Sequence, residues 1–418
     1  MPKNALYAQS GGVTSVINAS ACGLIEAARE NKIKVFAGHN GVTGVLSEDL
    51  IDTSKESNQD IAALHYTPSG AFGSCRYKLK DIEKNNNECK RLIEVFAAHN
   101  IGYFFYNGGG DSQDTIYKIS CFSQQAGYPL ICIGIPKTID NDLPFTDCCP
   151  GFGSAAKYVA TSICEASFDI LSMAATSTKV FILEVMGRHT GWLAAAGGLA
   201  SKNHSNVNGA PQIILFPEIA FNQELFLQRV ELCIKKYGFC SIVVSEGVRN
   251  EEGKFLSDCD LKDAFGHTQL GGAGTIVAQM IRNNLKYKCQ LAIANYLQRS
   301  ARHIASKVDI EQSYAVGKAA LELALKGKNN IMTTIVRESD KPYRWSVGSA
   351  PLEQVANMER KMPRSYITED GFHITEECLN YLTPLIQGED FPAFENGLPK
   401  YVRLRNNSVP KKLGSLIN

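Results

Sequence analysis

The stretch from Glu88 to Ile135 reads ECKRLIEVFAAHNIGYFFYNGGGDSQDTIYKISCFSQQAGYPLICIGI. Its first part has the apolar spacing of an amphipathic helix, and the apolar, aromatic-rich run GYFFYN that follows is typical of a buried strand. Three glycines, a second helical pattern and the apolar run PLICIGI come next. Because helix-length segments separate the two strand-like runs, the stretch predicts parallel strands joined by helical crossovers.

The same alternation extends towards both ends of the chain. Strand-like runs occupy 4–9, 34–39, 179–185, 212–217 and 240–247, and helical patterns occupy 14–30, 191–201 and 225–238. We therefore expect an α/β fold with an open, mainly parallel sheet that carries helices on both faces. Ligands of such sheets bind at the carboxyl ends of the strands.

Composition sets the class of protein. The chain has 418 residues, of which 44% are hydrophobic and 20% charged, as in a soluble globular protein of two domains or one large domain. A net charge of +1 gives no reason to expect nucleic acid or a membrane as partner. The 13 cysteines show no zinc-type spacing, and we see no signal region or membrane-spanning run. We expect a cytoplasmic protein with reduced thiols.

Two glycine-rich turns follow predicted strands. In QSGGVTSVIN, Gly11 and Gly12 precede a helix, so their backbone N–H groups could bind an anion; a purely structural turn is an equally good explanation. In YNGGGDSQDT, Asp111 follows three consecutive glycines. Helix capping is the structural alternative there, but capping does not require three glycines. This second turn, with Gly109, Gly110, Asp111 and Ser112, therefore favours a phosphate or metal-phosphate site.

The run GIPKTIDNDLP, at 134–144, crowds charged groups after a predicted strand. In an extended segment Thr138, Asp140 and Asp142 project to one side, where two carboxylates repel each other unless a cation or proton transfer offsets the repulsion. One carboxylate could act as general base towards a sugar hydroxyl and its neighbour could hold Mg²⁺. A solvated, Asx-rich turn is the structural alternative.

Three later motifs place polar groups where sugar phosphates could bind. Arg188 in EVMGR suits a phosphate, and Glu246 in SEGV could accept hydrogen bonds from sugar hydroxyls. Tyr296 and Arg299 in YLQR could hold a sugar phosphate. Each motif also has a structural alternative. Helix packing explains the Ala- and Gly-rich run that follows Arg188, Glu246 could be a surface residue, and YLQR could lie on a solvated helix face.

The motifs SGG, GGGDS, GIPKTIDND, EVMGR and SEGV occur together in the order of the phosphofructokinase family, over most of the chain. The chain resembles that family, and PKTIDND with MGR is the most specific pair. A lysine at position 137 resembles the pyrophosphate-dependent branch of the family, because ATP-using members usually have glycine at this position. The resemblance implies reversible, Mg²⁺-dependent phosphoryl transfer from pyrophosphate to the 1-hydroxyl of fructose 6-phosphate.

The resemblance also implies roles for individual residues. Asp140 resembles the general base, Asp142 the second catalytic aspartate and Thr138 a hydroxyl that contacts the phosphoryl group. Gly11 matches a glycine that contacts the donor phosphates, and Arg76 in GSCRYKL resembles the arginine that neutralises the transferring group. The residues that resemble the fructose 6-phosphate site are Met186, Gly187, Arg188, Glu246, Tyr296, Arg299 and Lys179, the last often reaching across a subunit interface.

Two positions depart from the family pattern. Gly110 stands where the family has its metal-binding aspartate, and Asp111 stands where ATP users often have glycine. We expect Asp111 to take over the metal, or Mg²⁺ to be held mainly by substrate phosphates. The charge of Asp111 would repel a nucleotide α-phosphate while Lys137 attracts pyrophosphate, so both favour pyrophosphate. The motif FGHTQLGGAG, with His267, falls outside the family order and is expected to be an insertion of unknown role.

The resemblance implies two Rossmann-like, three-layer domains with mainly parallel sheets, and a homodimer. The donor domain is expected at 1–152 plus about 298–348, and the fructose 6-phosphate domain at about 153–297 plus 349–418. An ATP-dependent phosphofructokinase is the nearest alternative. A lipid or NAD kinase has a similar glycine-aspartate loop, but EVMGR and YLQR argue against it. A non-catalytic sugar-phosphate sensor would be expected to have lost the aspartate loop.

Overall fold

The computed structural model describes residues 4–79, 86–202, 207–257 and 272–414. The chain forms two compact units. Unit 1 comprises Met1–Gly151, Lys307–Arg360 and Glu389–Asn418, and unit 2 comprises Phe152–Ser306 and Lys361–Gly388. Each unit has its own sheet, so each is described by itself.

The strands of unit 1 are β1 Asn4–Ser10, β2 Val35–Gly38, β3 Leu50–Asp52, β4 Ser74–Cys75, β5 Ile101–Gly108, β6 Ile131–Pro136, β11 Ile331–Asp340 and β12 Tyr343–Pro351. They form one sheet in the order β12-β11-β6-β5-β1-β2-β3, with β4 paired to β1. The pairs β2–β3 and β11–β12 are antiparallel and the other pairs are parallel. A further hairpin consists of β13 Phe394–Glu395 and β14 Leu398–Pro399.

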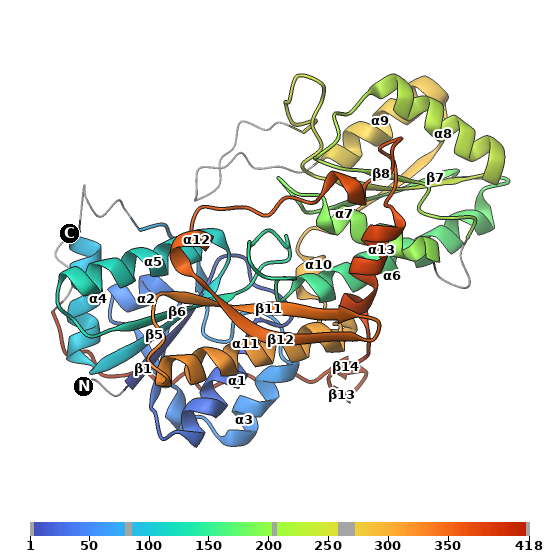
Figure 1. Cartoon of the computed structure of the whole chain (residues 1–418). Helices are drawn as coiled ribbons and strands as arrows, with labels where there is room; N and C mark the ends of the chain where they lie inside the picture. The colour runs from blue at the N-terminus through green and yellow to red at the C-terminus, as the bar shows by residue number, and fades with distance from the viewer. Residues whose placement is uncertain (1–3, 80–85, 203–206, 258–271, 415–418) are drawn as a thin grey trace. The chain divides into compact units, whose positions relative to one another are not determined.

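Helices cover both faces of the unit 1 sheet: α4 and α5 lie on one face, and α1 and α11 on the other (Figure 1). Phe104 and Tyr106 of β5 pack with Phe96 of α4 and Ile116 of α5. Phe105, which lies between them in the strand, is buried on the opposite face of the sheet. Burial on both faces explains why β5 reads as a continuous apolar run. The helices are α1 Ile17–Glu30, α2 Val42–Leu46, α3 Asn58–Ala63, α4 Asn87–Ala98, α5 Gly110–Gln125, α11 Lys307–Leu325 and α12 Leu352–Val355.

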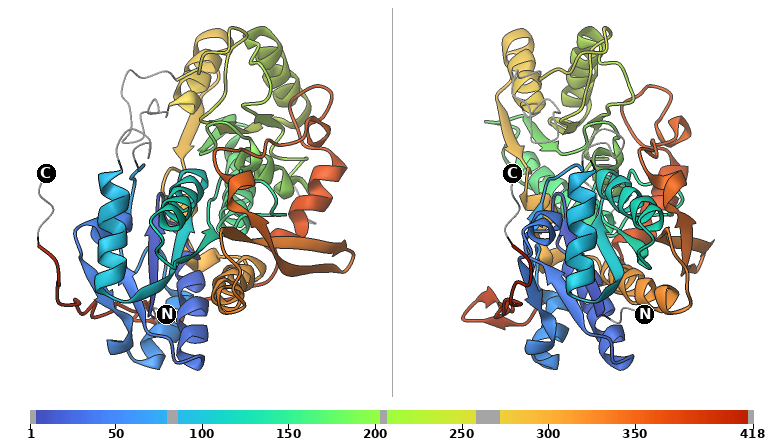
Figure 2. Two further views of the ribbon diagram at one scale, coloured as in Figure 1. Left: turned by 60° about the vertical axis from the view of Figure 1, so that its left-hand side comes forward. Right: turned by 90° about the vertical axis from the view of Figure 1, so that its left-hand side faces the viewer.

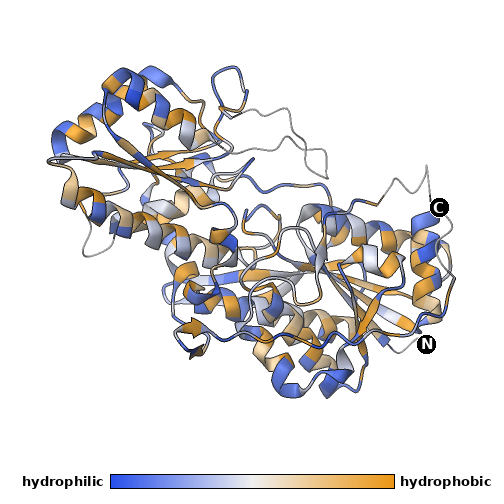
Figure 3. Cartoon of the chain, turned by 180° about the vertical axis from the view of Figure 1, so that it is seen from behind, coloured by the Kyte–Doolittle hydropathy of each residue, from blue (hydrophilic) through white to orange (hydrophobic). Residues whose placement is uncertain are grey.

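Unit 2 contains a parallel sheet in the order β10-β7-β9-β8, formed by β7 Val180–Val185, β8 Ile213–Leu215, β9 Cys240–Ser245 and β10 Cys289–Ile293. Its helices are α6 Phe152–Met173, α7 Trp192–Gly197, α8 Gln223–Tyr237, α9 Ala273–Leu285, α10 Leu297–Ser300 and α13 Glu376–Leu382. Helices α8 and α9 lie side by side on one face of this sheet (Figures 1 and 2). The sheet strands are strongly hydrophobic, whereas the helices mix polar and apolar residues (Figure 3).

The predicted α/β class with mainly parallel, helix-covered sheets is confirmed. The two units differ from the expected domain boundaries at four places: 152 and 298–306 belong to unit 2, and 349–360 and 389–418 belong to unit 1. The tail 389–418 joins unit 1 because it is hydrogen-bonded there, for example from Val409 N to Leu50 O at 2.8 Å.

The sequence also predicted an insertion around His267, reduced thiols and no membrane-spanning segment. His267 lies outside the described residues. Within the described part of the chain, no disulfide joins any of the cysteines. None of the described helices combines the length and the hydrophobicity of a membrane-spanning segment.

Candidate active site

Three neighbouring strands of unit 1 carry the predicted donor-binding motifs at their carboxyl ends. Strands β1, β5 and β6 are adjacent and parallel, with β5 in the middle. The turn at Gly11 follows β1, the turn at Gly109 follows β5, and Lys137 follows β6. The sheet therefore brings these three predicted segments to one edge.

The first glycine turn is joined to Lys137. Gly11 has φ +74°, a left-handed conformation that favours glycine, and its N–H donates to Cys75 O at 2.9 Å. The Lys137 Nζ atom donates to Gly12 O at 2.6 Å, and a Cβ on Gly11 would lie 3.4 Å from that Nζ. Lys137 is 4% exposed, so its ammonium group is fixed beside the turn rather than mobile in solvent.

Arg76 lies next to the same turn. Strand β4 pairs with the end of β1, with Gln9 opposite Ser74 and Ser10 opposite Cys75. Arg76 follows β4 directly and is exposed. The short parallel bridge therefore places this cation beside the first glycine turn.

The second glycine turn begins α5. The N-terminus of a helix carries a partial positive charge, so this end of α5 favours binding of an anion. Ser112, predicted to bind the donor, is buried and donates from Oγ to Ser10 Oγ at 2.8 Å, which links α5 to β1. Asp111 is partly exposed and its Oδ1 lies 3.4 Å from Lys78 Nζ. Lys78 is a cation that the sequence reasoning did not single out, although it lies two residues after Arg76.

The aspartate loop is turned rather than extended, which corrects the expected geometry. Asn141 has φ +55° and is fully buried, and its Oδ1 accepts a hydrogen bond from Cys149 N at 2.9 Å. This contact holds a left-handed residue in the middle of the expected extended segment. Thr138 Oγ1 donates to Asp140 Oδ2 at 3.3 Å and accepts from Asp140 N at 3.0 Å.

The surroundings of Asp142 favour its neutral form. Asp142 is partly accessible to solvent, but protein atoms surround its carboxyl group closely. Burial, followed by repulsion from Asp140 and Glu359, raises the pKa of Asp142 to about 7, although Lys137 opposes the shift. Asp142 can therefore carry a proton near neutral pH.

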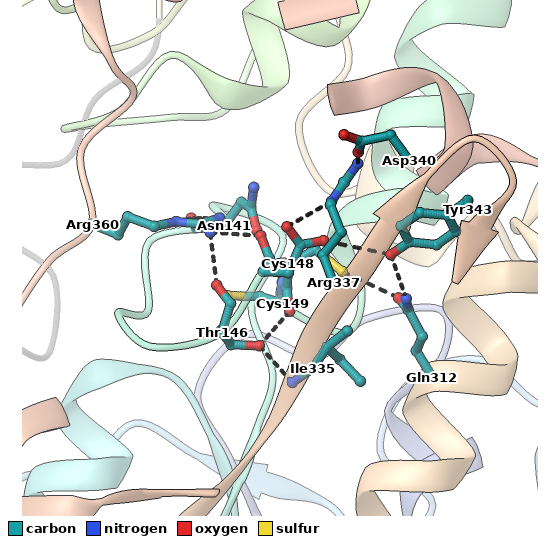
Figure 4. Close-up of polar contacts among 11 residues, drawn as sticks. Asn141, Thr146, Cys148, Cys149, Gln312, Ile335, Arg337, Asp340, Tyr343 and Arg360 are labelled. Atoms are coloured by element: carbon teal, nitrogen blue, oxygen red, sulfur yellow. Dashed lines mark hydrogen bonds and ion pairs between the residues drawn. The ribbon is translucent and has the colours of Figure 1, made fainter. Parts of the chain in front are cut away.

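An arginine that the sequence reasoning missed binds this loop. The Arg360 guanidinium donates to the backbone carbonyl oxygens of Asn141, Thr146 and Asp147 (Figure 4). Its own backbone N–H donates to Asp142 O at 2.6 Å. No local pattern around residue 360 signals this contact.

In unit 2, the predicted sugar-phosphate residues follow three neighbouring strands, β10, β7 and β9. Gly187 N, after β7, donates to Glu246 Oε1, after β9, at 3.3 Å. Met186 N donates to Gln298 Oε1 at 3.3 Å, which connects β7 to the segment after β10. The structure therefore brings the EVMGR, SEGV and YLQR motifs together at one edge of the sheet.

Charged and aromatic groups are accessible at this edge. Tyr296 is 58% exposed, and the Arg299 guanidinium carbon lies 3.6 Å from the centre of its ring. Arg188 is half-buried. Glu184, also in EVMGR, is buried and accepts hydrogen bonds from Gly272 N and Gly274 N at the start of α9.

Lys179 is not brought to this edge within one chain. It precedes β7, whereas Met186 follows it, so the two lie about 20 Å apart along the strand. Its Nζ donates to Ala174 O at 2.6 Å.

The predicted Mg²⁺ site has few protein ligands. Within the described residues, no group of three or more His, Cys, Asp or Glu side chains could hold a metal. Mg²⁺ bound to phosphorylated substrates usually takes one or two carboxylates, with phosphates and water completing its shell. The partly exposed Asp111 carboxylate beside the α5 N-terminus fits that limited role.

Comparison with known proteins shows which family the chain belongs to. Residues 4–324 match the family model described as phosphofructokinase. The chain is 62% identical to a pyrophosphate--fructose 6-phosphate 1-phosphotransferase of Halomonas elongata, covering 98% of each chain. It is 59% identical to the protein of that name from Methylococcus capsulatus, covering 99% of this chain and 98% of the relative.

Among solved structures, the crystal structure of a pyrophosphate-dependent phosphofructokinase from Nitrosospira multiformis superposes with a TM-score of 0.92, at 58% identity and full coverage of both chains. The relatives thus share the sequence of nearly the whole chain, and the solved structure shares its fold. This chain belongs to the phosphofructokinase family.

Proposed function

We propose that this chain reversibly transfers a phosphoryl group from pyrophosphate to the 1-hydroxyl of fructose 6-phosphate, giving fructose 1,6-bisphosphate and phosphate. The names of its full-length relatives support this activity. The observation that carries the donor assignment is the Lys137 ammonium group, buried and hydrogen-bonded to the first glycine turn. A cation fixed there suits a small, highly charged donor that has no nucleoside to bind.

On the donor side, pyrophosphate would lie against the two glycine turns and the N-terminus of α5. Arg76 and Lys137 would offset negative charge that develops on the transferring group. Asp111 would hold Mg²⁺, which when bound neutralises charge on phosphate oxygens. Asp111 also places a carboxylate where a nucleotide would need room and neutral surroundings, so it disfavours ATP.

On the acceptor side, Asp140 would take the proton from the sugar 1-hydroxyl as its oxygen attacks phosphorus. The Thr138 hydroxyl, hydrogen-bonded to Asp140, would orient this carboxylate and contact the phosphoryl group. Asp142 would organise the loop. Unit 2 would hold fructose 6-phosphate through its three connected motifs, with Glu246 accepting from sugar hydroxyls and Arg188 and Arg299 facing phosphate.

We also propose that the protein acts as a cytoplasmic homodimer. Lys179 lies at the far end of β7 from the other sugar-phosphate residues, so a role at a sugar phosphate requires a second copy of the chain. The cysteines that the structure describes are scattered and form no disulfide, which fits a reducing compartment.

The test is a donor assay of the purified chain with fructose 6-phosphate and either pyrophosphate or ATP. We expect kcat/KM to be at least about 100-fold higher with pyrophosphate, since about 3 kcal/mol of differential binding suffices. Asp140→Ala gives the background and should lower kcat by several orders of magnitude. Asp111→Gly combined with Lys137→Gly should lose pyrophosphate use and gain some ATP use. Robust ATP activity with none from pyrophosphate would reject the proposal and favour the ATP-dependent alternative.

A further inference from the structure

We propose that Arg360 is a positioning residue, which holds the loop that carries Asp140 and Asp142 in its reactive shape by binding the backbone of that loop. The inference rests on the proposed function for the roles of the two aspartates. It adds a residue that lies 219 positions from the loop in sequence.

The contacts of Arg360 span the loop. Its Nε and Nη2 donate to Asn141 O at 3.2 and 2.9 Å, and its Nη1 donates to Thr146 O at 2.7 Å and Asp147 O at 2.6 Å. A planar guanidinium carries five N–H donors in a fixed fork, so it can bind three carbonyls at once. A lysine ammonium presents one compact centre and cannot span the same set.

The Arg360 guanidinium and the carbonyls of Asn141, Thr146 and Asp147 that it binds, called the clamp below, lie directly beside the aspartates. Asn141, which separates Asp140 from Asp142, receives two of the four guanidinium hydrogen bonds. The backbone N–H of Arg360 donates to the carbonyl of Asp142. The Asn141 side chain then closes the loop on itself at Cys149. A shift of Arg360 would therefore move the backbone on both sides of the left-handed residue.

The opposite end of the loop, which Arg360 also binds, has further contacts that do not involve Arg360 (Figure 4). Asp147 accepts from Arg337 Nε at 2.9 Å and from the Tyr343 hydroxyl at 3.4 Å. Thr146 Oγ1 accepts from Ile335 N of β11 at 2.9 Å. Since these contacts fix the loop to β11 and β12 without Arg360, loss of Arg360 should loosen the aspartate end while the loop stays attached.

The experiment compares Arg360→Lys and Arg360→Ala with wild type in the full chain. Arg91→Lys is the matched control, because Arg91 also binds backbone carbonyls in unit 1, those of Leu46 and Gly414, away from the loop. We expect kcat of Arg360→Lys to fall about 10- to 100-fold, as small misplacements of reacting groups do. The KM values for both substrates should change less than about threefold, because the clamp touches no substrate.

Chemical rescue separates positioning from a general loss of stability. Arg360 is half-buried, so a small guanidinium ion can enter the space left by Arg360→Ala. Guanidinium at a low, non-denaturing concentration should restore part of kcat in this variant, and equal sodium chloride should not. Arg91→Lys should keep kcat within about twofold of wild type. A folded Arg360→Ala protein with wild-type kcat would overturn the proposal.

Hydrogen exchange of the loop tests the clamp without any activity. Peptides that cover 141–149 should exchange faster in both Arg360 variants and at the wild-type rate in Arg91→Lys. Unchanged exchange in the Arg360 variants would refute the clamp. Faster exchange in a protein whose wild type lacks pyrophosphate activity would support the clamp and refute the proposed function, so the two failures are distinguishable.

Discussion

Asp142 makes the stability of this protein depend on pH in a direction opposite to that of most paired carboxylates. Burial and the neighbouring Asp140 raise its pKa from 3.8 to about 7. Between these values the folded chain binds more protons than the unfolded chain. The free energy of unfolding therefore falls as pH rises, and the neutral form of Asp142 stabilises the fold fully only below about pH 4.

Replacing Asp142 by asparagine should remove this dependence. We expect Asp142→Asn to match wild type near pH 4 and to be more stable at pH 8 by on the order of 1–3 kcal/mol. This is less than the roughly 4 kcal/mol that the full pKa shift corresponds to, because Asp142 is partly accessible to solvent, which screens its charge. Urea unfolding of the metal-free, substrate-free chain across this range measures it. Asp169→Asn, at an exposed position of α6, is the control. A difference from wild type that stays constant with pH would contradict the assignment.

At the residue scale, the sequence identified side chains that adjoin one another after a strand. Asp140, Asp142 and Lys137 lie within six positions, so their charges form a recognisable pattern. Arg360 could not be identified in this way, because it acts on backbone carbonyls, which every residue has. The turn at Asn141 was missed for a related reason: its left-handed conformation depends on a hydrogen bond from Cys149, eight residues away.

At the element scale, the turn from β5 into α5 shows which of its three glycines the fold requires. A Cβ on Gly108 would lie 2.1 Å from Ser112 Oγ, the hydroxyl that links α5 to β1. A Cβ on Gly110, the first residue of α5, would meet no atom within 4 Å. The packing requirement at this turn therefore falls on Gly108, and Gly110 leaves open space.

This difference predicts opposite effects of two alanine substitutions. Gly110→Ala should leave the free energy of unfolding unchanged or raise it by up to about 1 kcal/mol, because alanine favours the helix. Gly108→Ala should lower it by about 1–3 kcal/mol, because the new methyl group displaces Ser112. Thermal unfolding of the two variants compares them directly. Equal destabilisation by both would show that Gly110 is also packed.

The sequence predicted the parallel strands better than the antiparallel ones, for a physical reason. Strands β5 and β9 are buried on both faces, so they read as unbroken apolar runs. The long hairpin of β11 and β12 was not predicted. Only the first half of β11 is buried, and its second half, Val336–Asp340, is partly or fully exposed and mostly polar, so no periodic signal remains. Tertiary pairing, rather than local pattern, forms this hairpin.

At the scale of the whole molecule, the C-terminal tail decides where unit 1 ends. Glu48 is buried and accepts hydrogen bonds from Lys412 N at 2.6 Å and Leu413 N at 3.0 Å. Its carboxylate also lies 2.6 Å from the ring of buried His99. Burial alone would raise the pKa of Glu48, but these hydrogen bonds outweigh it and lower the pKa below 4.5. The ionised carboxylate therefore stabilises the tail on unit 1 above about pH 4.5, and this stabilisation is lost as pH falls through the lowered pKa.

Substituting Glu48 by glutamine tests the assignment of the tail to unit 1. Glutamine is uncharged and has one acceptor oxygen instead of two, so it cannot replace all three contacts of the Glu48 carboxylate. We therefore expect Glu48→Gln to lower the free energy of unfolding by about 1–3 kcal/mol at pH 7, and by less in acid. Hydrogen exchange should accelerate in peptides covering 407–414 and in β3, which pairs with the tail at Ser408, and should not change in β7 or β9 of unit 2. Glu395→Gln is the matched control, because Glu395 lies on the same tail with its side chain 60% exposed and paired with Lys400. Accelerated exchange in the unit 2 strands instead would favour the boundary expected from the sequence, which grouped 349–418 with the second domain.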